Sequence, residues 1–135
     1  METTIERIGD GSTAIVAVSG EIDASNFQGL IDVGRELRAA GTERLIIDMS
    51  DLSYMASSGL VALYSLVVIM RGEEPPDPEA GWSAFHAIGT DPDSGANRSV
   101  KLLAPQPQVS RVLERTGLTR YFDVYLDRDM ALASF

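Results

Sequence analysis

The chain has 135 residues, a formal net charge of -9 and no cysteine. Its length suits one domain, because single hydrophobic cores most often hold about 100 to 150 residues. The negative charge argues against nucleic acid and anionic lipid as partners, since both repel an acidic surface, and favours basic surfaces on partner proteins. The absence of cysteine excludes disulfides, thiolate metal sites and a cysteine nucleophile.

No segment predicts secretion or membrane insertion. The first residues, 1–6, have neither the basic start nor the apolar stretch of a signal peptide. The longest apolar segment, residues 60–70, is interrupted by Ser65 and is shorter than the roughly 20 residues that cross a bilayer. We therefore expect a cytoplasmic protein without membrane insertion.

The first half of the chain alternates strand and helix signals. Residues 4–8 and the β-branched run at 14–18, which continues to residue 23, predict two strands joined by a turn at 9–12. Ser25 and Gln28 have the spacing of a capping box, and the helix that follows them is predicted to end at Gly41.

Next comes a buried strand at 45–49, which leads through residues 50–55 into a helix that begins near Ser57 and ends near Arg71. Residues 72–99 then contain four prolines and no sustained periodicity, which predicts a long inserted loop. Within it, Trp82, Phe85 and Ile88 have helical spacing and predict a short covering helix in preference to an exposed docking motif.

The remaining segments predict a strand at 100–104, a helix at 108–116 that ends at Gly117, a short strand at 124–126 and a last helical turn capped by Asp127. Helices that follow strands in this order are typical of an α/β domain. We expect one domain over residues 1–135, with a mixed, largely parallel sheet of about five strands and about four helices.

Three segments together resemble the STAS family of anti-sigma factor antagonists. They are Gly20-Glu21-Ile22-Asp23, the stretch from Leu45 through Ser57-Ser58-Gly59 to Leu60, and Val112-Leu113-Glu114-Arg115-Thr116-Gly117-Leu118. Their order and spacing extend over nearly the whole chain except the 72–99 loop, and they imply a STAS-like domain.

The resemblance implies a serine switch. In antagonists of this family the first serine of an Asp-Ser-Ser-Gly motif is phosphorylated by a partner that is both kinase and anti-sigma factor, and here this position is Ser57, with Ser58 as the second choice. The unphosphorylated form would bind that partner, and a phosphatase would restore it. Ala56 stands where the family has aspartate, whereas Asp23 matches an acidic position expected near the same helix start.

The partner surface implied by the resemblance consists of residues at or near this helix start, namely Asp23, Ser57, Ser58, Gly59, Val61 and Tyr64. In the apolar helix we expect Leu63, Leu66, Val67 and Met70 to point inward and Val61, Tyr64 and Val68 to lie nearer the surface.

Simpler interpretations of the same residues stay open. Ser57 or Ser58 could serve only as a helix N-cap, Asp23 could be a turn residue, and Gly20 and Gly59 could permit close backbone approach. The alternative function is a STAS scaffold that is not phosphorylated, in a stressosome-like or transporter-associated complex, and Ala56 and the inserted loop are its motivation.

Enzyme function is not expected. The single histidine, His86, lies in the irregular insertion, and no Gly-x-Ser-x-Gly elbow surrounds Ser57 or Ser58. The chain has neither a cluster with metal-ligand spacing nor a phosphate-binding loop with its lysine. We therefore predict neither a cofactor nor a metal.

Overall fold

The structure, a computed structural model, describes residues 1–74, 99–117 and 122–135. The strands are β1 (Glu2–Ile8), β2 (Thr13–Ile22), β3 (Arg44–Asp48), β4 (Leu52–Met55), β5 (Val100–Leu103) and β6 (Val124–Tyr125). The helices are α1 (Phe27–Ala39), α2 (Ser57–Met70), α4 (Pro107–Thr116) and α5 (Arg128–Ala133). The loop predicted over 72–99 lies largely outside the described residues, together with Trp82, Phe85, His86 and Ile88.

These strands form one six-stranded sheet in the order β1-β2-β3-β5-β6, and β4 pairs with β2 outside this path. The β1–β2 pair is antiparallel, whereas β2–β3, β2–β4, β3–β5 and β5–β6 are parallel. The predicted α/β class with a mixed, largely parallel sheet is confirmed, with one strand more than the expected five.

The additional strand is β4, in a stretch that the sequence pattern predicts as a connection between β3 and α2. Strand β2 pairs along residues 13–17 with β3 and along residues 20–22 with β4, and the register shifts at Gly20. Gly20 has a φ of 86° and donates its N–H to the carbonyl oxygen of Asp51 at 3.1 Å. Such a positive φ suits glycine. Gly20 pairs with Leu52 and Glu21 with Tyr54, so Ser53 of β4 is the extra residue of a β-bulge at this step.

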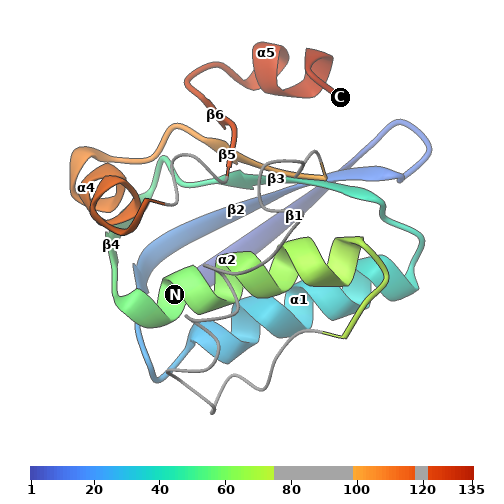
Figure 1. The fold of residues 1–135 in the computed structure, drawn as a ribbon. Coiled ribbons are helices and arrows are strands. Elements are labelled where there is room, and N and C mark those ends of the chain that lie inside the picture. The colour runs from blue at the N-terminus through green and yellow to red at the C-terminus, as the bar shows by residue number, and fades with distance from the viewer. Residues whose placement is uncertain (75–98, 118–121) are drawn as a thin grey trace.

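The sheet is covered on both faces (Figure 1). Alternate side chains of β2 and β3 point to opposite sides, as the pleat requires. Val16 and Ile47 join the larger core with α1 and α2, whereas Ile15 and Ile46 join a smaller cluster with Ala131 of α5. Helix α4 lies beside β4, and its Val109 and Leu113 are also part of the larger core.

The predicted capping box of the first helix is wrong. Helix α1 begins after Asn26, which makes no side-chain cap hydrogen bond. Ser25 lies one residue before this N-cap position, and its hydroxyl donates to the Asp23 carboxylate at 2.5 Å. The predicted end of this helix is confirmed, because Gly41 has a φ of 100° and follows the C-cap residue, Ala40.

Helix α2 is buried along almost its whole length. Leu63, Leu66, Val67 and Met70 are buried as expected, but Val61 is 3% exposed, Tyr64 6% and Val68 5%, so their predicted position near the surface is wrong. A helix that is apolar on every side is typically enclosed in a core, and the periodicity of its residues alone does not reveal this. In the described part of the chain, no helix has the length and hydropathy needed to cross a membrane.

Candidate functional site

The carboxyl ends of β2 and β4 fix the start of α2. Ile22 is paired with Met55, and the Ala56 N–H donates to the Ile22 carbonyl oxygen at 2.8 Å. The next residues, Asp23 after β2 and Ala56 after β4, therefore leave the sheet at the same edge. Ser57 follows as the first residue of α2.

The N-terminus of α2 has no side-chain cap. Ala56 occupies the N-cap position and Ser57 and Ser58 lie within the helix, so the interpretation of either serine as the N-cap is wrong. The first turn contains no acidic residue. Because the first amides of a helix lack intrahelical acceptors and its dipole is positive at this end, this terminus favours a negative charge.

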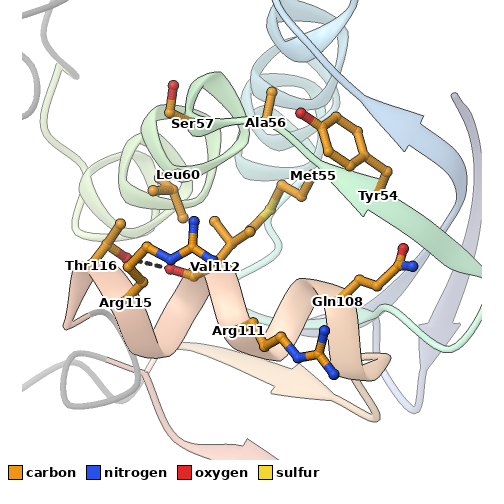
Figure 2. A pocket seen from close by; sticks show the side chains of 10 residues that line it. All are labelled: Tyr54, Met55, Ala56, Ser57, Leu60, Gln108, Arg111, Val112, Arg115 and Thr116. Carbon is orange, nitrogen blue, oxygen red and sulfur yellow. Dashed lines mark hydrogen bonds between the residues drawn. The ribbon is translucent and has the colours of Figure 1, made fainter.

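The two serines have different surroundings. Ser57 is exposed, and in Figure 2 its side chain points away from α4. The Ser58 hydroxyl oxygen is buried and has no hydrogen-bond partner in the described structure. Of the two hydroxyls, only that of Ser57 is accessible to another protein.

Asp23 forms a compact turn ahead of α1. Its carboxylate accepts from the Ser25 N–H at 2.9 Å and from the Ser25 hydroxyl, and these bonds hold the pKa of Asp23 below its ordinary value. The Asp23 N–H donates to Asn26 Oδ1, and Asn26 Nδ2 donates to the Glu21 carbonyl oxygen, both at 2.9 Å. The interpretation of Asp23 as a turn residue is thus confirmed, and a partner-binding role for Asp23 stays a prediction.

Gly59 permits the tight packing of α2 on the strands. A Cβ at this position would lie 2.3 Å from Met55 Cγ and 3.2 Å from Ile22 Cγ2. The interpretation of Gly59 as a site of close approach is therefore confirmed. Gly59, Val61 and Tyr64 are all buried, so a partner-binding role for them stays a prediction.

A groove of about 610 Å³ lies between the start of α2 and helix α4. One wall consists of Tyr54, Met55, Ala56, Ser57 and Leu60, and the other of Gln108, Arg111, Val112, Arg115 and Thr116. Figure 2 shows Met55 and Leu60 of the first wall facing Val112 of the second. The Arg115 guanidinium extends among these side chains, whereas Arg111 points away from α2.

Helix α4 is held in place at both its start and its buried side. Gln106, its N-cap residue, donates from Nε2 to the Ser50 carbonyl oxygen at 2.7 Å, which ties it to the turn before β4. Val109 and Leu113 are buried, whereas Arg111 and Arg115 are exposed. The groove and its arginines were not predicted from the sequence, although the spacing of the two arginines, four residues apart on a helix, places them on one face.

A family model described as the STAS domain matches residues 4–72, just over half of the chain. The chain belongs to the STAS domain family. The predicted family is therefore confirmed, and the matched part of this STAS domain contains Asp23, Ala56 and Ser57. Helix α4, the other wall of the groove, follows the matched residues.

Solved structures share the fold of this STAS domain. An anti-sigma factor antagonist from Mycobacterium paratuberculosis is 23% identical, with 98% of this chain and 92% of that chain covered and a TM-score of 0.67. A putative anti-sigma factor antagonist from Thermotoga maritima is 15% identical, with coverage of 97% and 92% and a TM-score of 0.71. The Bacillus cell fate determinant SpoIIAA in its phosphorylated form is 17% identical, with coverage of 98% and 97% and a TM-score of 0.59.

At these identities the likeness concerns the fold. Among curated protein sequences, none matches this chain. Across the described residues, no group of three or more histidine, cysteine, aspartate or glutamate side chains is arranged to hold a metal ion.

Proposed function

We propose that this STAS domain is a regulatory protein-binding module of the anti-sigma factor antagonist type, and not an enzyme. In its unphosphorylated state it binds an anti-sigma factor with kinase activity in the cytoplasm. Phosphorylation of Ser57 by that partner releases it, and a phosphatase restores the binding form.

The observation behind this proposal is the exposed Ser57 hydroxyl on the first residue of α2, in a family member whose fold is shared by anti-sigma factor antagonists. A phosphate on Ser57 would lie close to uncapped helix amides and to the positive end of the helix dipole. The fold should therefore tolerate the modification, and its effect should be felt where a partner binds.

The size of that effect is sufficient for a switch. A phosphate adds about -1.5 to -2 charges at pH 7, and in an interface it must be desolvated or repelled. A cost of about 1 to 3 kcal/mol corresponds to a loss of affinity of about 5-fold to 150-fold.

A phosphorylation assay on alanine variants tests whether Ser57 or its neighbour Ser58 is the modified residue. The protein is incubated with ATP and the kinase encoded beside it or captured with it, and its intact mass is measured. We expect the addition of one phosphate in the wild type and in Ser58→Ala, and none in Ser57→Ala. An unchanged wild-type mass, or a phosphate that persists in Ser57→Ala, would contradict the assignment.

Ala56 favours a second candidate function, a STAS scaffold that is never phosphorylated, in a stressosome-like or transporter-associated complex. An aspartate at position 56 could orient the serine or complete the active site of the kinase, and alanine can do neither. A scaffold should bind its partner equally well as wild type and as Ser57→Glu. Strong weakening in Ser57→Glu would count against the scaffold and in favour of the switch.

A further inference from the structure

We infer that the groove between α2 and α4 is a docking surface for an acidic segment of a partner protein, with apolar side chains between its carboxylates. The inference rests on the proposed function in one respect, namely that a partner covers the surface around Ser57. Beyond the proposed function, the inference assigns helix α4 to the partner-binding surface and states the chemical character of the partner segment that binds there.

Charge is the first observation. Of the residues that the structure describes, those that line the groove include Arg111 and Arg115 and no aspartate or glutamate, although the chain as a whole has 20 acidic residues against 11 basic ones. The groove is thus a local exception to the acidic character of the molecule. A carboxylate-bearing segment is the complementary ligand, because a guanidinium donates in a planar fork that matches a carboxylate.

The second observation is that these two arginines are available. Both are exposed, and neither forms an ion pair with a carboxylate in the described part of the chain. Other basic side chains are already engaged, as Arg35 is with Glu74 at 2.9 Å and Arg128 is with Glu6. Arg111 and Arg115 can therefore bind a partner without breaking an internal ion pair.

The third observation is the apolar surface between the walls. Val112, between Arg111 and Arg115 on α4, is partly exposed, whereas Leu60 and Met55 on the other wall are buried, so a partner would contact Val112 and Tyr54. Tyr54, at the edge of the groove, is 48% exposed. A half-exposed tyrosine next to aliphatic side chains and arginines is typical of the centre of a protein interface.

This arrangement also links the groove to the serine. Ser57 is one of the lining residues, but its side chain points away from α4, so a phosphate on it would add negative charge at the α2 rim of the groove. Like charges within about 8 Å of each other repel and are not fully screened at physiological salt, so a charge at this rim opposes the approach of an acidic segment. Phosphorylation would thus weaken docking in the groove itself.

The inference can be tested with two short blocked peptides, one of leucine and glutamate and one in which lysine replaces each glutamate. Each is titrated into the 15N-labelled full chain, and amide shifts and affinity are measured. We expect the glutamate peptide to shift the amides of Tyr54, Leu60, Val112 and Arg115, and to bind Arg115→Glu at least about fivefold more weakly.

Arg7→Glu is the matched control, because Arg7 is exposed on β1, outside the groove, and its replacement changes the net charge equally. It should bind the glutamate peptide about as well as the wild type does. If Arg7→Glu and Arg115→Glu weaken binding equally, or if the peptide shifts no groove amide, the inference is wrong.

A third titration, with inorganic phosphate, distinguishes a protein-docking surface from a simple anion site. Shifts caused by phosphate but not by the glutamate peptide would overturn the inference. Thermal unfolding of each variant verifies that it is folded. None of these measurements involves a kinase, so a failure here and a failure of Ser57 phosphorylation can be told apart.

Discussion

Gly59 and Met55 are so close that a Cβ added to Gly59 would lie 2.3 Å from Met55 Cγ and 2.8 Å from its sulfur. Gly59→Ala would therefore have to displace a fully buried side chain that also lines the groove. We expect a loss of about 1 to 3 kcal/mol in the free energy of unfolding, measured by denaturant titration, because overpacking a core outweighs the helix propensity of alanine.

Gly29→Ala is the control for that variant. Gly29 lies in α1, and its added Cβ would meet only Met1 Cε at 3.5 Å, an ordinary contact. This substitution should be neutral or should stabilise the protein by up to about 1 kcal/mol. Equal effects of the two substitutions would show that packing at Gly59 is not tight.

Ser58→Ala should stabilise the protein. The Ser58 hydroxyl is buried without a hydrogen-bond partner, so its removal relieves a desolvation penalty of about 1 kcal/mol or more. Ser57→Ala should change the free energy of unfolding by less than about 0.5 kcal/mol, because Ser57 is exposed and does not cap the helix. Chemical denaturation of both variants compares them directly, and destabilisation by Ser58→Ala would contradict this expectation.

Asn26→Ala should destabilise the turn between β2 and α1. The Asn26 amide accepts from the Asp23 N–H and donates to the Glu21 carbonyl oxygen, so the substitution removes two hydrogen bonds and should cost about 1 to 2 kcal/mol. Gln28→Ala is the comparison. The capping-box pattern predicts a hydrogen bond from Gln28 back to the start of the helix, and the structure shows no side-chain cap there. The cost of Gln28→Ala, from thermal unfolding, should be within about 0.5 kcal/mol of zero.

The Asp23 carboxylate should titrate below its ordinary range. Its pKa is lowered by hydrogen bonds from the Ser25 hydroxyl and N–H, so Ser25→Ala should raise the pKa of Asp23 while leaving that of Asp10 unchanged. Because the folded-state pKa is the lower one, the stability from Asp23 is complete above the ordinary aspartate pKa and is lost as the pH falls through the folded value. Carboxyl 13C shifts followed against pH measure both residues, and an unchanged pKa of Asp23 in Ser25→Ala would refute the role of the hydroxyl bond, because the N–H bond remains in that variant.

Much of this fold could be predicted from local patterns. The β-branched run of β2, the glycine after α1 and the aspartate before α5 each determine local backbone geometry, and the Asp127 carboxylate does accept from the Met130 N–H at 3.0 Å. The Ser57-Ser58-Gly59 stretch, together with the segments at 20–23 and 112–118, was enough to identify the family and to place the candidate serine at a helix start.

Other features depend on contacts between distant parts of the chain. Strand β4 has exposed Ser53 and Tyr54 between its buried ends, which is no strand pattern by itself, and it is formed by pairing with residues 20–22 of β2, far away in the sequence. The capping box is not formed, because the turn made by Asp23, Ser25 and Asn26 delays the start of α1, so that Asn26 and not Ser25 occupies the N-cap position.

The sequence by itself determined the family, the main elements and the position of Ser57, because these follow from local geometry and from short motifs. Only the tertiary structure decided that Ser57 is accessible while Ser58 is not, that Val61 and Tyr64 are buried, and that α4 faces α2 across a groove. Burial and the meeting of α2 with α4 are properties of packing, and packing depends on all neighbours at once rather than on the order of residues in one segment.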